Sequence, residues 1–171
     1  MKKSSAKASG PSHSGPSNTA SKIAPVASFQ FAVGDAGTTL TDDQMQQLAQ
    51  SFHDISVAIG QIRLDAIKSG ASLTDAGVVQ LQGYVFSLKN ISDNMALQAA
   101  NLTLQNADQA LQQISLATQS ADHALDKLAN IDKAIQIASA VIVLGAALSS
   151  RDVSQIGTAA KGVVTACGMA V

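Results

Sequence analysis

The sequence contains no proline between Val26 and Val171, and this absence is what most constrains the fold. Proline ends or kinks helices, so most of the chain is free to form long ones. Aromatic residues make up only 3% of the chain, so a core has to be built mainly from Ala, Leu, Ile and Val. Such small side chains suit closely approaching helices better than a sheet sandwich. The sequence therefore predicts an all-α fold, a bundle of long amphipathic helices.

Residues 1–27 are rich in Ser, Ala, Lys, Gly and Pro and contain no acidic residue, the first being Asp35. Residues of these types cannot form a buried core, so we expect a disordered tail that continues as a loop to residue 37. A single helical domain over 38–171 should follow. The tail has no apolar h-region of a secretory signal peptide. A type III export leader, an organelle transit peptide and a plain flexible tail remain open. We expect a protein that is secreted without a cleavable Sec signal, or cytoplasmic.

Residues 42–68 carry the clearest helical pattern. Thr41 is the expected N-cap and Gln44 completes a capping box, while Lys68 and Gly70 supply the cation and the glycine that end a helix. Between them, apolar residues recur every three or four positions, which is a coiled-coil type seam. The seam consists of Met45, Leu48, Phe52, Ile55, Ile59, Ile62 and Ala66.

A second helical pattern runs over residues 75–132. It begins at Thr74 and Asp75, a Thr-Asp start like the one at residue 41, which predicts the same capping arrangement. The apolar seam changes register along this helix, which indicates either a broad apolar face inside a bundle or a break. The weak helix formers within 90–94 mark where a break would fall. Its later part alternates Leu with Ala on the apolar seam, which predicts close antiparallel packing on a neighbouring helix.

The chain is uncharged from Ala134 to Ser150 and apolar on all sides over its middle, so this segment must be buried in something. The sequence predicts an apolar C-terminal hairpin of helices over 133–149 and 152–169. Small residues recur every four positions in the second helix, which predicts that Gly162 lies in close contact with the first. The residues expected to meet a membrane or a partner are Ile135, Ile137, Val141, Ile142, Val143, Leu144, Gly162, Ala166 and Ala170.

Three interpretations of this hairpin are open. It can be a central core helix with its neighbour, because apolar runs of this length are more often core helices than membrane spans. It can be stored in a soluble form and released into a bilayer. It can also be a permanent protein–protein interface.

The net charge of −1 and the scattered cations argue against a nucleic-acid partner, because such binding needs clustered Lys and Arg. His53 and His123 lack a second His or a Cys one helical turn away, so we expect no metal site. Cys167 is the single cysteine and is expected to pack as a small apolar residue. The sequence contains none of the glycine-rich phosphate or nucleophile motifs. We therefore expect no enzyme, no cofactor and no small-molecule substrate.

The long amphipathic helices around one apolar hairpin resemble the general plan of α-helical pore-forming toxins and type III translocators. The Ala-, Gln- and Asn-rich stretch from Met95 to Gln113 resembles subunits of bacterial R-bodies. Both resemblances imply a non-enzymatic bacterial protein and carry no site residues. We expect an exported or membrane-active protein whose hairpin inserts in a membrane or binds a partner. The alternative is a soluble coiled-coil scaffold or self-assembling subunit, whose partners are copies of itself or another helical protein.

Overall fold

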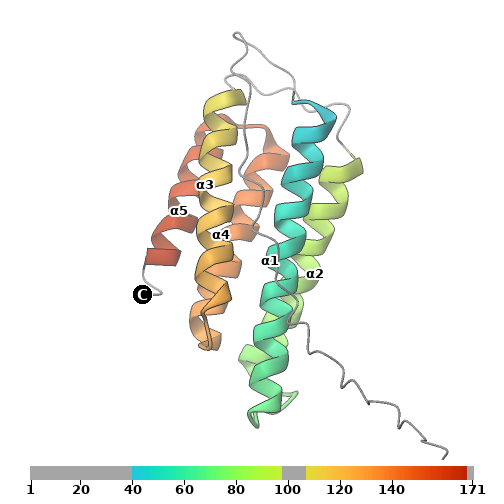
Figure 1. The fold of residues 1–171 in the computed structure, drawn as a ribbon, viewed down its shortest axis with the longest axis vertical. Coiled ribbons are helices and arrows are strands. Elements are labelled where there is room, and N and C mark those ends of the chain that lie inside the picture. Colours follow the sequence, from blue (N-terminus) through green and yellow to red (C-terminus); the bar gives the residue numbers. More distant parts are fainter. Residues whose placement is uncertain (1–39, 98–106, 169–171) are drawn as a thin grey trace, which may run out of the picture.

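The computed structural model describes residues 40–97 and 107–168, and within these ranges it contains five α-helices and no strand (Figure 1). The helices are α1 (Asp42–Lys68), α2 (Ala76–Leu97), α3 (Ala107–Asp126), α4 (Ile131–Ser150) and α5 (Val153–Gly168). The predicted all-α bundle with an apolar C-terminal hairpin is confirmed. The predicted tail and loop over residues 1–37 lie outside the described residues.

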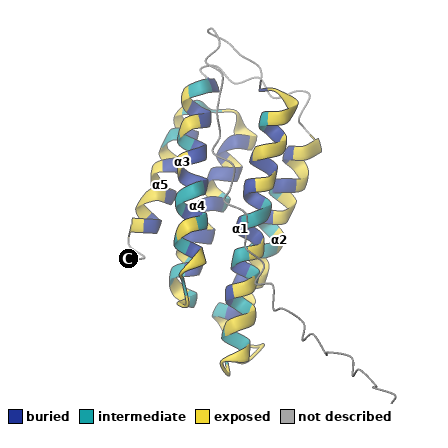
Figure 2. Ribbon diagram, in the orientation of Figure 1, coloured by how far each residue is buried: buried dark blue, intermediate teal, exposed yellow. Residues whose placement is uncertain are grey.

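The helices form two antiparallel pairs, α1 with α2 and α4 with α5, and α3 lies beside α5 (Figure 1). Helix α4 contacts each of the other four helices, whereas α5 contacts only α3 and α4 among the described residues. Buried residues line the inward side of every helix (Figure 2). The apolar helix α4 is therefore the centre of the bundle, and α5 lies at its edge.

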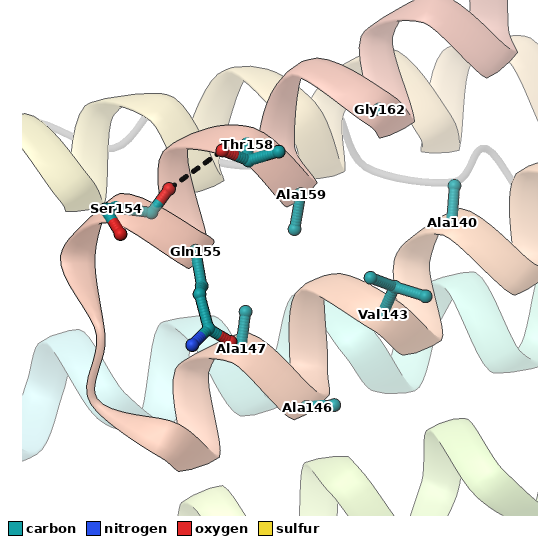
Figure 3. Close-up of a pocket in the computed structure, with 9 residues that line it drawn as sticks. All are labelled: Ala140, Val143, Ala146, Ala147, Ser154, Gln155, Thr158, Ala159 and Gly162. Atoms are coloured by element: carbon teal, nitrogen blue, oxygen red, sulfur yellow. Dashed lines mark hydrogen bonds between the residues drawn. The ribbon is translucent and has the colours of Figure 1, made fainter.

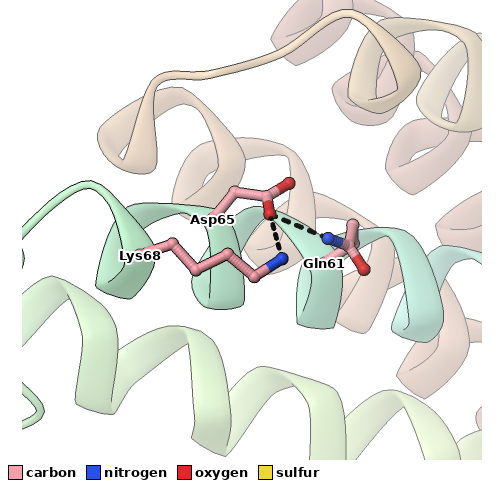
Figure 4. Close-up of polar contacts among 3 residues, drawn as sticks. All are labelled: Gln61, Asp65 and Lys68. Carbon is pink, nitrogen blue, oxygen red and sulfur yellow. Dashed lines mark hydrogen bonds and ion pairs between the residues drawn. The ribbon is translucent and has the colours of Figure 1, made fainter.

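Helix α1 forms as its sequence predicts. The Gln44 backbone N donates to Thr41 Oγ1 at 3.2 Å, and the Thr41 backbone N donates to Gln44 Oε1 at 2.9 Å, which completes the capping box. The predicted seam is buried from Met45 to Ile62. Hydrogen bonds from Gln61 and Lys68 hold the pKa of the exposed Asp65 carboxyl below its ordinary value of 3.8 (Figure 4).

The prediction of one long helix over 75–132 is wrong. Helix α2 ends at Leu97, and α3 runs in the opposite direction to α2 (Figure 1). A second interruption separates α3 from α4, where the Asn130 side chain accepts a hydrogen bond from the Lys133 backbone N at 3.1 Å and caps the new helix. Residues 75–132 therefore contain two separate helices and the start of a third.

A break at residues 90–94, which was one of the two possibilities for this segment, does not occur, because α2 is helical throughout them. Ser92 is buried against α1, and its Oγ donates to the Ala49 carbonyl at 2.7 Å. A partner on another helix thus satisfies a hydroxyl that would otherwise compete with the helix backbone. The start of α2 also differs from that of α1, since the Asp75 carboxylate accepts from the Ser72 backbone N at 2.8 Å instead of forming a second capping box.

Candidate interaction face on α4 and α5

The central helix α4 has one deeply buried side and one open side. Ile137, Val141 and Leu144 are fully buried, whereas Val143 is 56% exposed. Ile135 and Ile142 are half-buried between these extremes. Within the described residues, α4 is the one helix long and apolar enough to cross a membrane, and 44% of its apolar window is buried in the bundle. The length and hydropathy of α4 therefore suit a membrane span, whereas its burial is typical of the core helix of a bundle.

The turn between α4 and α5 is built from backbone geometry and one carboxylate. Arg151 ends α4 in the left-handed region, with φ of 60°, and its N–H donates to the Leu148 carbonyl at 3.1 Å. Asp152 Oδ1 accepts from the backbone N of Ser154 at 2.9 Å and caps α5. Hydrogen bonds from Ser154 and Gln155 lower the pKa of Asp152 below 3.8. These contacts fix the angle at which α5 leaves α4.

A groove of about 600 Å³ runs between the two helices (Figure 3). Side chains from both helices line it, most of them small and none of them charged. We call it the α4–α5 groove, and its lining residues are Ala140, Val143, Ala146, Ala147, Ser154, Gln155, Thr158, Ala159 and Gly162. It is open to solvent next to the exposed Val143 side chain, so an apolar side chain of another molecule could enter it.

The expectation that Gly162 lies in close contact with α4 is wrong. A Cβ at Gly162 would have no atom of another segment within 4 Å. The buried stripe of α5 passes instead through Ile156, Ala160 and Val163, which leaves Gly162 at the groove. Ala166 is buried within the bundle, and Ala170 lies outside the described residues.

Close contacts of glycines occur elsewhere in the bundle. A Cβ at Gly145 of α4 would lie 2.7 Å from Ile91 Cδ1 of α2. A Cβ at Gly157 of α5 would lie 2.9 Å from Gln113 Oε1 of α3. Both distances are shorter than side-chain packing allows. Gly145 of α4 and Gly157 of α5 are therefore the positions of these two helices where a larger residue would require a neighbouring side chain to move.

Sequence reasoning missed most of the groove. It found Val143, Gly162 and Thr158 but not the small residues around them, such as Ala140, Ala146 and Ala159. A signal was present, because α4 carries no charged residue from Ala134 to Ser150 and the outward positions of α5 carry one, Lys161. Outward positions of surface helices usually carry charges.

The remaining chemistry-bearing side chains of the described residues include Cys167, Asp54 and Asp122. Among the described residues, no three His, Cys, Asp or Glu side chains are grouped so that they could hold a metal ion. Cys167 is buried, and burial raises the pKa of its thiol. Asp54 of α1 and Asp122 of α3 line a small void together, and burial raises the pKa of Asp122 above 3.8.

Comparison with known proteins identifies no matching family model, no similar curated protein and no similar solved structure. The α4–α5 groove, together with the uncharged surface around it, is the candidate interaction face.

Proposed function

We propose that this chain is a non-enzymatic helical subunit that assembles with copies of itself through the outer face of α4 and α5. The observation that carries the proposal is the α4–α5 groove, an open and uncharged depression between two apolar helices. Val143 projects at this face as an exposed branched side chain. In a symmetric dimer the same patch lies on both subunits, so the Val143 side chain of each copy can enter the groove of the other.

The surface charge supports self-association. Charged residues make up 13% of the chain, and the exposed positions of α4 from Gln136 to Ser150 carry none. Two such faces approach each other with little charge to desolvate. Depletion of charge is typical of the buried centre of protein interfaces. Lys161 is the charged residue of α5 and stands at the edge of this face.

The test compares two valines of equal exposure. Val143 is 56% exposed on α4, and Val57 is 57% exposed on α1. Size-exclusion chromatography with light scattering should give an oligomer for the parent and for Val57→Asp, but a monomer for Val143→Asp. Because both side chains are exposed, neither aspartate is forced into the core. A parent chain that is monomeric at all concentrations would contradict the proposal.

Membrane insertion is the second candidate, and the length of α4 favours it. Twenty residues span about 30 Å as a helix, which matches the hydrocarbon core of a bilayer. Insertion would require α4 to leave its contacts with the other helices. Val143 lies near the middle of α4, so Val143→Asp should weaken insertion by about 2.5–3.5 kcal/mol on insertion scales.

Flotation with phosphatidylcholine–phosphatidylglycerol vesicles tests this second candidate separately. If α4 inserts, the parent should float with the vesicles and Val143→Asp should remain in the soluble fraction. A parent chain that never floats between pH 4.5 and pH 7.5 would rule out insertion and would leave the assembly proposal standing.

A further inference from the structure

Four large apolar side chains are exposed on α1 and α2. Val57 and Leu64 lie seven residues apart on α1, so both occupy one side of that helix. Val79 and Phe86 have the same spacing on α2. The exposed fractions of the four side chains range from 47% to 59%. We call these four residues the outer patch.

The antiparallel packing of α1 and α2 places the two halves of the outer patch beside each other (Figure 1). A Cβ at Gly60 of α1 would lie 3.8 Å from Val85 Cγ2 of α2, and each of these two residues is within one helical turn of a patch residue. Arg63 Nε donates to the Val78 carbonyl at 3.2 Å, and each of these two residues directly precedes a patch residue. The four exposed side chains therefore form one cluster along the contact between α1 and α2.

Most of the surface around the outer patch carries no charge. Helix α1 is uncharged over residues 55–62, and α2 is uncharged over residues 76–88. Charges begin at the Leu64 end, where the Arg63 guanidinium is hydrogen-bonded to α2. Single exposed apolar side chains are common, whereas a cluster of them marks a surface to which another segment or molecule binds.

The chain itself contains a segment whose chemistry matches this surface. Residues 23–34 are uncharged and include Phe29 and Phe31, two of the four phenylalanines in the sequence. Phe29, Phe31 and Val33 occupy alternate positions, so in an extended conformation their side chains face the same side. This segment lies outside the described residues and precedes α1 in the sequence.

The length of the chain before α1 allows this segment to reach the outer patch. Leu40 is buried at the start of α1. Measured along the helix, Val57 lies about 22 Å and Leu64 about 33 Å from the first residue of α1. An extended chain spans about 3.3 Å per residue, so Val33 and Phe29 can lie up to about 23 Å and about 36 Å from Leu40. The alternating apolar residues are therefore long enough to cover both ends of the patch.

We propose that residues 29–33 lie in an extended conformation along the outer patch of their own chain, with the ring of Phe31 against that of Phe86. The contact between the two rings should contribute most, because aromatic side chains bury the largest area and attract each other. Docking of a tethered segment is intramolecular, so it should not depend on protein concentration. The proposal concerns the segment after the N-terminal tail and is independent of the α4–α5 groove.

The first test uses the absence of tryptophan from the sequence. Phe31→Trp in the full chain introduces a single fluorescent reporter, whose emission should lie at shorter wavelength than that of tryptophan in water. Adding Phe86→Asp should shift the emission to longer wavelength and raise the acrylamide quenching constant several-fold. Leu116→Asp is the matched control, because Leu116 is 62% exposed on α3 and Phe86 is 59% exposed. It should change neither reading.

Three outcomes would overturn the proposal. The first is water-like emission of the Phe31→Trp chain before any second substitution. The second is a response to Val143→Asp instead of Phe86→Asp, which would place the segment in the α4–α5 groove. The third is a change of oligomeric state caused by Phe86→Asp in size-exclusion chromatography with light scattering, which would show that a second copy covers the outer patch.

A second measurement needs no variant. In the NMR spectrum of the full parent chain, the ring protons of Phe31 should show nuclear Overhauser effects to the methyl groups of Val79 or to the ring of Phe86. These effects should persist on dilution, because the segment is tethered to the helix pair that it covers. A Phe31 ring with no such contact to the outer patch would overturn the proposal, whether or not the variants fold.

Discussion

The α1–α2 pair and the group formed by α3, α4 and α5 fill their interiors with side chains of different size. The pair buries large residues: Met45, Leu48, Phe52, Ile55, Ile59, Leu81 and Leu88 are among its fully buried side chains. The group of three buries fewer large residues and many alanines: Ala107, Ala110, Ala117, Ala121, Ala134, Ala138, Ala147, Ala159, Ala160 and Ala166. In the pair, Ala49 is the buried alanine.

This difference implies two ways of stabilising one bundle. A large buried side chain contributes through the apolar area that it removes from water. A buried alanine contributes less area but lets two helix backbones approach closely, so its site has little spare volume. The pair should therefore be most sensitive to loss of side-chain volume, and the group of three to gain of volume.

The largest effect is expected from truncation in the pair. Phe52 is fully buried on α1, so Phe52→Ala should lower the free energy of unfolding by about 3–5 kcal/mol. Urea unfolding followed by circular dichroism measures it. Val57→Ala on the exposed side of the same helix should change the value by less than about 0.5 kcal/mol. If Phe52→Ala costs no more than its control, α1 is peripheral and the comparison fails.

The second-largest effect is expected from enlarging a buried side chain in the group formed by α3, α4 and α5. Ala138 of α4 is fully buried, and Ala138→Val should cost about 1–3 kcal/mol because the added methyl groups overpack the site. Ala146→Val is the control on the same helix, at an exposed position. Urea melts of both variants give the difference. Equal stability of the two variants would show that the Ala-rich interior has room to spare.

The N-cap residues should contribute equally to stability in the two regions, although the interiors of the two regions differ. Thr41 caps α1 and Asn130 caps α4 through the same kind of side-chain hydrogen bond. Thr41→Ala and Asn130→Ala should each cost about 1 kcal/mol, whereas the conservative Thr41→Ser should be nearly neutral. Thermal unfolding of the three variants and the parent measures these differences. A much larger loss at Asn130 would mean that the α3–α4 connection is stabilised mainly by that one side chain.

The smallest effect should be a gain in stability. A Cβ at Gly162 or at Gly83 would meet no atom of another segment within 4 Å. Gly162→Ala and Gly83→Ala should each raise the free energy of unfolding by about 0.5–1 kcal/mol, because alanine favours the helix over glycine. Destabilisation by Gly162→Ala alone would indicate a close contact of Gly162 with α4, which the structure does not contain.

Helix α1 could be predicted to the residue because every signal that defines it is local. Its cap at Thr41, its seam and its end at Lys68 lie within one continuous segment. The long helix over 75–132 could not be divided correctly in the same way. Ser92 is a weak helix former by local chemistry, but its hydroxyl donates to Ala49, 43 residues away in the sequence. The contact that removes its local disadvantage is visible only in the folded chain.

The sequence predicted only part of the candidate interaction face, for a related reason. Periodicity predicted a small-residue stripe on α5 and assigned it to the contact with α4, but it could not show that α3 would compete for the same helix. Helix α3 also packs on α5, and the buried residues of α5 include Ile156 and Val163. Gly162 is consequently turned to the groove. A helix with small residues on several sides can pack closely through any of them. Which side is buried depends on the neighbouring helices.

The described residues contain one salt bridge, Lys68 to Asp65, with both side chains well exposed. Screening by salt weakens attractions between exposed charges, but this bundle has almost no such attraction to lose. Kosmotropic salts such as sulfate strengthen the burial of apolar groups because they are excluded from the protein surface. Increasing ionic strength should therefore leave the bundle intact, and a salting-out salt should make it harder to unfold.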